Sequence, residues 1–201
     1  MGTGTWLEEM AATCQVLGLD DHDESLEIAG PRIQAVGGRV MKTTLEQIPL
    51  ESECATVVTA MDVLEHIEDD AATLRELWRL VKPGGVLILT VPALPFLWSD
   101  WDESLHHFRR YRKQDLARTI EPLNSEVLRL AYFNASAILP VWFVRSRRKY
   151  RKPKPGEEWA EHRVPAPFLN RLLYASMVHP AKWRWFQPPL GVSLLAVLRK
   201  S

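Results

Sequence analysis

Residues 61–92 read MDVLEHIEDDAATLRELWRLVKPGGVLILTVP, and this stretch decides the fold. Within it, apolar side chains recur three and four residues apart at Leu74, Leu77, Trp78 and Val81, which places them on one face of a helix. The run KPGG should stop that helix, because proline lacks a backbone donor and glycine readily adopts positive φ. The apolar run VLILTV that follows predicts a buried strand.

Two apolar runs nearer the amino terminus predict further buried strands. Residues 15–19 read QVLGL and end at the acidic pair Asp20 and Asp21, whereas residues 55–60 are rich in β-branched side chains. The first of these strands therefore carries carboxylates at its carboxyl end.

Helical patterns alternate with these strands. They cover residues 6–12, residues 25–29 and the stretch from Asp70, and the second should be broken by Gly30 and Pro31. Such alternation, with strands that are apolar throughout, indicates an α/β fold with a doubly wound, mainly parallel sheet covered on both faces.

The pattern changes after Pro92. A helix near 113–120 and a strand near 127–133 continue the alternation, and residues 191–198 close the chain as a strand. Between them, helix-like stretches are separated by a basic, proline-rich linker. We therefore expect residues 1–133 and 191–201 to form the core, and residues 134–190 to form an inserted helical lobe before the last strand.

Charge is unevenly distributed along the chain. Residues 1–80 carry 5 basic and 16 acidic side chains, and residues 81–201 carry 20 and 9. This asymmetry fits a cationic ligand near one half and an anionic partner near the other, or simply two solvated faces, and we favour the second explanation. Cys14 and Cys54 are too few for a disulfide framework and lack metal-binding spacing, so we expect buried thiols in a reducing compartment.

The sequence favours a cytoplasmic protein. Its longest uncharged run, 130–144, has 15 residues, whereas a membrane-spanning helix needs about 20. No basic and apolar leader precedes the first helix, so a secretory signal is not indicated. We expect a soluble protein, or one held peripherally at the inner membrane surface.

A glycine turn opens the chain, with Gly2 and Gly4 flanking Thr3. Because glycine has no Cβ, such a turn lets backbone N–H groups approach a ligand closely. About sixteen residues later, Asp20 ends a strand, where its carboxylate can accept hydrogen bonds from both ribose hydroxyls. The turn alone is common in loops and the acid alone is a common cap, but together they predict a nucleoside site.

The run from Met61 to Asp102 closely resembles class I S-adenosylmethionine-dependent methyltransferases, and the order of elements from Gly2 to the last strand matches that family. Each of the signatures LEHI and KPGG is modest evidence for this family by itself, but the two together are strong evidence. A nicotinamide-dependent dehydrogenase would share the glycines and the ribose acid but not this pair.

The resemblance implies a seven-stranded sheet with an antiparallel last strand, and S-adenosylmethionine lying across the carboxyl ends of the first strands. It assigns the cofactor-binding residues in groups: Gly2, Thr3 and Gly4 beside the methionine portion, Asp20 with the adjacent Asp21 at the ribose, Ala60, Met61 and Asp62 on the methionine side, and Thr44 and Leu45 near the adenine. The family often has an Asp at the adenine position, and this chain does not.

The first strand of the family pattern is missing. In the family that strand precedes the glycine turn and sits centrally, between the strands that here end at Asp20 and Ala60. Its loss would leave backbone groups unpaired at about 1–3 kcal/mol each. We expect an earlier start, a partner chain that completes the sheet, or direct pairing of the two flanking strands.

Asp62, Glu65 and His66 allow two interpretations. Asp62 and Glu65 have the spacing of a capping box. Alternatively, all three lie on one helical face as a divalent metal patch. Because the cap explains two of the three residues without a ligand, we predict no metal, and we expect His66 to be a packing residue.

Residues 106–111 read HHFRRY and follow the strand and loop where acceptor substrates generally bind in the family. Methyl transfer is an in-line displacement, so the protein supplies alignment, and a base when the acceptor arrives protonated. His107 or Tyr111 can take that proton, and Arg109 or Arg110 can hold an anionic acceptor. A helix-start cluster with solvated arginines is the competing interpretation.

Seven basic residues lie between 145 and 154, after an apolar helix that contains Trp142. The segment 142–154 can contact an anionic membrane surface, or it can be a solvated linker. No nucleic-acid-binding motif accompanies it, so no nucleic-acid partner is expected.

These observations predict an S-adenosylmethionine-dependent methyltransferase that acts on a small-molecule or lipid-like acceptor. The alternative is a truncated, non-catalytic methyltransferase-like binding protein, in which the glycine turn no longer holds the cofactor.

Overall fold

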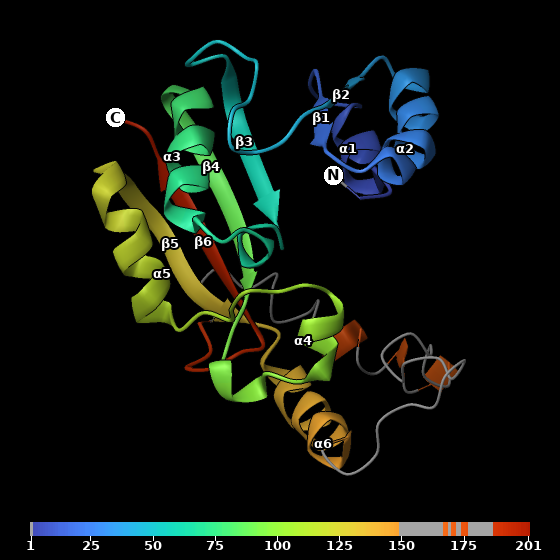
Figure 1. Cartoon of the computed structure of the whole chain (residues 1–201), viewed down its shortest axis with the longest axis vertical. Helices are drawn as coiled ribbons and strands as arrows, with labels where there is room; N and C mark the ends of the chain where they lie inside the picture. Colours follow the sequence, from blue (N-terminus) through green and yellow to red (C-terminus); the bar gives the residue numbers. More distant parts are fainter. Residues whose placement is uncertain (1, 149–166, 169, 172–173, 177–186) are drawn as a thin grey trace. The chain divides into compact units, whose positions relative to one another are not determined.

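The computed structural model describes residues 2–148, 167–168, 170–171, 174–176 and 187–201 (Figure 1). The chain divides into two compact units, Met1–Glu51 and Ser52–Ser201, and each is described by itself. Most of the second half of the expected lobe lies outside the described residues, so the division at residues 133 and 134 stays a prediction.

The first unit contains two helices and a two-stranded parallel sheet. Its elements in chain order are α1 (Thr5–Met10), β1 (Leu17–Asp20), α2 (Asp23–Ala35) and β2 (Arg39–Lys42). β1 and β2 pair in parallel with Asp20 opposite Lys42, so both strands end at the same edge of the sheet. The sequence predicted β1 with its terminal acids but missed β2, whose four residues include a charged residue at each end.

Helix α2 differs from the prediction because it continues through Pro31. Its buried side is formed by Ala29, Gly30 and Ile33, so the apolar face extends beyond the proline. Ile33 is fully buried, and burying a side chain of that size stabilises by about 1.5–3 kcal/mol. This burial offsets the hydrogen bond that Pro31 cannot donate.

The second unit is built on a four-stranded sheet in the order β3-β4-β6-β5. The strands are β3 (Ala55–Met61), β4 (Val81–Pro92), β5 (Glu126–Phe133) and β6 (Ser193–Arg199). β3 and β4 are parallel, and β6 lies antiparallel between β4 and β5. Three of the four strands therefore run in one direction, which confirms the predicted α/β fold with an antiparallel last strand.

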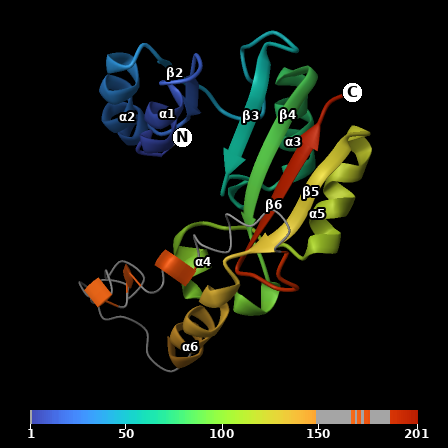
Figure 2. The ribbon, with the colours of Figure 1, turned by 180° about the vertical axis from the view of Figure 1, so that it is seen from behind.

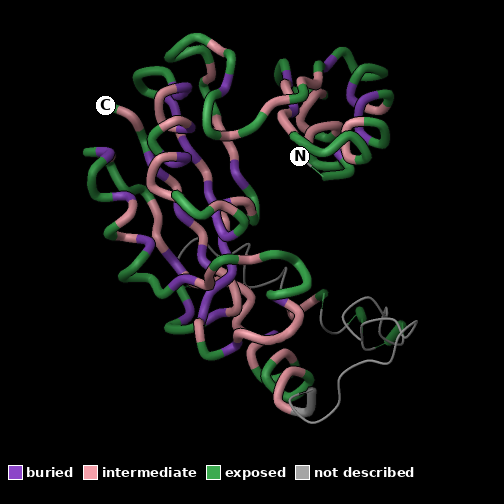
Figure 3. Tube along the Cα trace, in the orientation of Figure 1, coloured by how far each residue is buried: buried purple, intermediate pink, exposed green. Residues whose placement is uncertain are grey.

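Helices α3 (Asp70–Leu80) and α5 (Lys113–Ile120) lie on the same face of this sheet, and Figure 2 shows the strands from the other side. Along β4 and β6 burial alternates, and the purple positions of Figure 3 follow that pattern. Four leucines of these strands are fully buried, namely Leu87 and Leu89 in β4 and Leu194 and Leu198 in β6. The residues that alternate with them along each strand include partly covered ones. Within this unit, the described helices α3 and α5 therefore cover one face of the sheet.

The remaining described elements connect these layers. They are the helices α4 (Asp100–Ser104) and α6 (Ile138–Arg148) and the 3-10 turns Leu64–His66, Pro95–Leu97, Glu121–Leu123 and Ala135–Ala137. The part of the basic segment beyond Arg148 lies outside the described residues, so the predicted membrane contact stays a prediction.

Helix α3 ends just before the KPGG run, as expected, and one residue earlier than the periodicity suggested. The helix stops at Leu80, and Val81 already belongs to β4. Gly84 has φ +76°, and a Cβ on Gly85 would lie 2.7 Å from the carbonyl oxygen of Thr56. Both glycines are therefore required where the chain enters the parallel pair.

Among the described residues, β1 pairs only with β2, and β3 pairs only with β4. Direct pairing of β1 with β3 would join the two units, so it stays a prediction. β1 and β3 each keep one edge without a partner strand, where backbone N–H and C=O groups can accept a further strand.

Two smaller expectations have clear outcomes. Cys14 and Cys54 are free and exposed, so the expectation of buried thiols is wrong. Both lie next to turns, where short apolar side chains need not reach the core. Within the described part of the chain, none of the helices is both long and apolar enough to cross a membrane.

Candidate functional site

The glycine turn and Asp20 meet in the first unit. The backbone N–H of Gly2 donates to Oδ2 of Asp20 at 3.3 Å, and the N–H of His22 donates to Oδ1 at 3.0 Å. Burial raises the pKa of Asp20, but the charge of the amino terminus and these hydrogen bonds outweigh it, so that pKa lies below its ordinary value. An ionised carboxylate therefore faces the turn at neutral pH.

Gly4 lets the turn pack against helix α2. It has φ +73°, and a Cβ at this position would lie 2.9 Å from Cβ of Ala29 and 3.3 Å from Ile33. Gly2 also has a positive φ, but its Cβ would meet nothing within 4 Å. The backbone at Gly2 is thus open to a ligand, as a phosphate or nucleoside cradle requires.

A cavity of about 170 Å³ lies at this turn. It is lined by Gly2, Thr3, His22, Glu24, Ser25 and Ile28. The cavity combines exposed backbone, hydroxyl groups and one apolar side chain, and two of its lining residues, Gly2 and His22, donate backbone hydrogen bonds to Asp20.

The other cofactor residues predicted in this unit lie at the same sheet edge. Asp21 is exposed, and its Oδ1 lies 2.7 Å from Nδ1 of His22. Thr44 and Leu45 follow the end of β2, beside the end of β1. Thr44 is exposed and Leu45 is half-buried, which leaves both accessible to a ligand.

Ala60, Met61 and Asp62 stand at the carboxyl end of β3 in the second unit. Ala60 is buried, Met61 is exposed, and Asp62 has a left-handed φ of +52°. The N–H of Asp62 donates to the carbonyl oxygen of Thr90 at 3.0 Å, which holds this backbone against β4. Burial raises the pKa of Asp62 despite the nearby cationic groups.

The predicted capping box of Asp62 and Glu65 is not formed. The turn Leu64–His66 has no side-chain cap, and the following helix is capped by Asp69, which accepts from the N–H of Ala72. Glu65 instead is only 1% exposed. Burial raises its pKa to about 8.

His107 packs against the same turn. Its ring lies edge-on to the ring of His66, with centroids 4.6 Å apart. The N–H of Phe108 donates to the carbonyl oxygen of Glu65 at 2.7 Å, which fixes the histidine loop to the turn. Burial lowers the pKa of His107, and the charge of His66 lowers it further, so the imidazole is neutral at pH 7.

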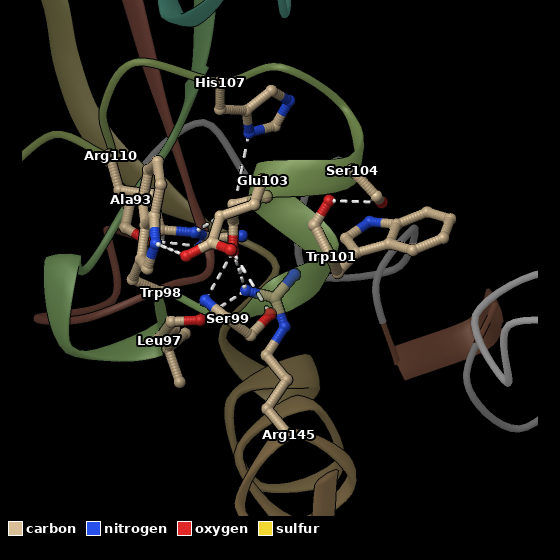
Figure 4. Close-up of polar contacts among 11 residues, drawn as sticks. Ala93, Leu97, Trp98, Ser99, Trp101, Glu103, Ser104, His107, Arg110 and Arg145 are labelled. Carbon is tan, nitrogen blue, oxygen red and sulfur yellow. Dashed lines mark hydrogen bonds and ion pairs between the residues drawn. The ribbon is translucent and has the colours of Figure 1, made fainter. Parts of the chain in front are cut away.

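The carboxylate of Asp102 contacts the side chains of His107, Arg110 and Arg145, which are labelled in Figure 4. It is fully buried, and its two oxygens lie 2.6 Å from Nε of Arg110 and 2.8 Å from Nη1 of Arg145. Nδ1 of His107 lies 3.3 Å from the same carboxylate. One carboxylate therefore joins α4, the loop after β4 and helix α6.

Sequence analysis missed Asp102 and treated Arg145 as part of a solvated basic run. The side chain of Arg145 is only 10% exposed, and it also donates to the carbonyl oxygen of Leu97. Since Asp102 lies in the acidic run SDWDES, nothing in its local pattern separates it from a solvated helix start.

Arg109 and Tyr111 are held by a second carboxylate, Asp70. Nη1 of Arg109 lies 3.0 Å from Asp70, and the hydroxyl of Tyr111 donates to the same group at 2.6 Å. Tyr111 is 3% exposed, and burial, with Asp70, raises its pKa far above its ordinary value. Both residues thus join the 107–111 loop to helix α3, and the phenol keeps its proton.

A larger cavity of about 600 Å³ lies elsewhere in the second unit. Leu94, Phe96, Arg112, Tyr132 and Leu190 are among its lining residues. None of the predicted catalytic residues lines it, so we do not assign it to the acceptor.

Comparison with known proteins supports the family resemblance. Residues 1–89 match the family model described as "Methyltransferase domain". The ubiquinone biosynthesis O-methyltransferase of Nitrosospira multiformis is 36% identical over 88 residues, which cover 42% of this chain and 37% of that protein. The aligned region thus spans about two fifths of the length of that relative.

Solved structures show the same fold over nearly the whole chain. A methyltransferase-like protein from Bacillus halodurans superposes with a TM-score of 0.65 at 19% identity, covering 99% of this chain and 89% of that one. A geranyl diphosphate methyltransferase in complex with S-adenosylmethionine gives 0.66 at 12% identity, covering 100% and 75%. Residues 1–89 thus match a methyltransferase family model, and the chain has the fold of solved class I methyltransferases, which agrees with the predicted resemblance.

Proposed function

We propose that the chain is an S-adenosylmethionine-dependent methyltransferase and that the Gly2–Asp20 turn holds the cofactor. The observation that carries this proposal is the hydrogen bond from the Gly2 N–H to the ionised Asp20 carboxylate, at a turn where Gly2 and Thr3 line a cavity. A match to methyltransferases over residues 1–89 supports it, because that region contains both groups.

The residues present fit the cofactor. The Asp20 carboxylate accepts hydrogen bonds from the ribose hydroxyls, and the open backbone at Gly2 and Thr3 borders the methionine portion. Asp21, Thr44 and Leu45 border the nucleoside at the same sheet edge. The assignment of Ala60, Met61 and Asp62, which lie in the second unit, to the methionine side stays a prediction from the family resemblance. When bound, S-adenosylmethionine supplies an electrophilic methyl group on a sulfonium.

The acceptor is a small molecule with a hydroxyl group, of the lipid-like, phenolic class. The name of the relative from Nitrosospira multiformis, a ubiquinone biosynthesis O-methyltransferase, favours this class. The neutral His107 offers a ring nitrogen on the acceptor side that can take the hydroxyl proton. Arg109 and Tyr111 position this loop through Asp70, and we assign neither of them a proton transfer.

Titration calorimetry with S-adenosylhomocysteine tests the cofactor site. Asp20→Ala removes the acceptor for the ribose hydroxyls, which should weaken binding by about 1–3 kcal/mol, or roughly 5- to 150-fold. Glu27→Ala is the matched control, because Glu27 is an exposed carboxylate on helix α2 of the same unit. Its affinity should equal that of the wild type.

Two results would count against the proposal. Equal affinities for Asp20→Ala and wild type would remove the ribose assignment. Absence of heat from the wild-type protein at millimolar ligand would favour the non-catalytic alternative. Thermal unfolding of both variants shows whether the fold is retained.

A further inference from the structure

The larger cavity of the second unit has no role in the proposed reaction. Its volume is about 600 Å³, which is typical of a site for a small molecule. The cavity is bordered by the loop after β4, the start of helix α5, strand β5 and residue 190. None of His107, Arg109 and Tyr111 lines it, so a ligand there would be distinct from an acceptor held by those residues.

The wall of this cavity is mainly apolar. Leu94, Leu130 and Tyr132 contribute to it. Two more of its large side chains are well exposed, Phe96 at 64% and Leu190 at 47%. Exposed apolar groups that gather around a hollow are typical of a ligand-binding surface. An apolar chain lying in the cavity would remove these groups from water.

Two local features of the fold hold this wall together. The N–H of Lys113 donates to the hydroxyl of Tyr132 at 3.3 Å. This bond ties the start of α5 to β5, beside which the helix lies (Figures 1 and 2). Gly191 lets the chain before β6 approach the end of β5, because a Cβ on Gly191 would collide with the carbonyl oxygen of Phe133. The neighbouring Leu190 is thereby brought to the cavity.

The charged groups at the cavity are all cationic. Arg112 and Lys113 line it, and none of the described lining residues is acidic. Both side chains are exposed, and neither pairs with an acidic side chain within the described part of the chain. The nearby Asp115 lies 3.8 Å from Arg118 instead. Two cations beside an apolar wall suit a ligand that is anionic at one end and apolar along its length.

We propose that this cavity binds an amphipathic anion of the lipid class, namely a single apolar chain that ends in a carboxylate or a phosphate. The guanidinium of Arg112 can bind either head group through two parallel hydrogen bonds, and the ammonium of Lys113 adds a second positive charge. Residues 81–201 carry 20 basic and 9 acidic side chains, which also favours an anionic ligand for this part of the chain.

A ligand in this cavity would contact both ends of the segment between β4 and α5. Leu94 and Phe96 lie near the beginning of that segment, and Arg112 lies at its end. The two ends are joined by the N–H of Leu94, which donates to the carbonyl oxygen of Tyr111 at 3.0 Å. Because His107 lies between these ends, the ligand would brace the loop that carries the candidate base.

Titration calorimetry of the wild-type chain with decanoate tests the site without any activity assay. We expect one ligand per chain for decanoate or decyl phosphate, and the tighter of the two identifies the head group. Decyltrimethylammonium has the same chain and the opposite charge, so it should bind roughly tenfold more weakly or worse. Octanoate should bind roughly 15-fold more weakly than decanoate, since each buried methylene contributes about a factor of four.

Variants of helix α5 and of its first turn locate the binding. The double substitution Arg112→Gln and Lys113→Gln should weaken decanoate binding by about 5- to 30-fold and leave the binding of uncharged decanol unchanged. Arg118→Gln is the matched control, because Arg118 is an exposed arginine of the same helix that does not line the cavity. Its affinity for decanoate should equal that of the wild type. Ala117→Phe fills the cavity and should weaken the binding of both decanoate and decanol.

Three results would overturn the proposal. They are failure of the wild type to bind either decanoate or decyl phosphate, equal affinities for octanoate and decanoate, and equal losses of affinity in Arg118→Gln and the double variant. The first two need only the wild-type chain, so they do not depend on the folding of a variant. Failure of S-adenosylhomocysteine to bind would leave the decanoate result unaffected, and this proposal therefore fails separately from the proposed function.

Discussion

At the scale of single residues, the sequence says more about the surroundings of Asp20 than about those of Tyr111. Asp20 follows an apolar run, and its Oδ2 accepts from Gly2, eighteen positions away, as the nucleoside pattern implies. Tyr111 stands among charged residues in the sequence, which suggested an accessible base. In the structure it is buried against Asp70, which only the packing of the loop on helix α3 determines.

Tyr111→Phe should therefore act on stability and not on proton transfer. Loss of the hydrogen bond to Asp70 should lower the free energy of unfolding by about 1–2 kcal/mol, since Arg109 still pairs with that carboxylate. Urea denaturation measures this change. Because its raised pKa keeps the Tyr111 phenol protonated, Tyr111→Phe should leave unchanged the rise of the methyl-transfer rate with increasing pH. Loss of that rise in the variant would show that Tyr111 is the base.

At the scale of elements, the long apolar strands and the amphipathic helix α3 follow from periodicity alone. Strand β2 was missed because four residues with charged ends carry too little pattern, and helix α2 passes Pro31 because its buried face continues to Ile33. The link between helix α6 and the loop after β4 could not be predicted, since it depends on one buried carboxylate, Asp102.

Asp102→Asn should loosen this link strongly. Removing one partner from a buried ion pair costs about 3–5 kcal/mol, because Arg110 and Arg145 would remain buried without their counter-charge. Glu126→Gln is the matched control, as its pair with Arg199 is exposed and such pairs contribute about 0–1 kcal/mol.

Denaturant unfolding of the two variants compares these costs. Equal losses of stability in Asp102→Asn and Glu126→Gln would contradict a central role for the buried carboxylate. The difference between the two losses of stability measures how much more the buried ion pairs of Asp102 contribute to stability than the exposed pair of Glu126.

At the scale of the whole molecule, the sequence predicted the class of fold because LEHI and KPGG occur together in the order that the family requires. The strand order β3-β4-β6-β5 and the antiparallel last strand agree with that prediction. The contact between the rings of His66 and His107 was not predicted, since His107 lies forty-one positions beyond His66 and only the fold brings their rings together.

The central claim is that the amino-terminal turn and Asp20 hold the nucleoside of the cofactor. A crystal structure of the chain grown with S-adenosylhomocysteine tests it most directly. We expect the ribose hydroxyls within hydrogen-bonding distance of the Asp20 carboxylate and the methionine portion beside Gly2 and Thr3. A bound ligand that leaves Asp20 facing solvent and contacts neither glycine of the turn would contradict the account.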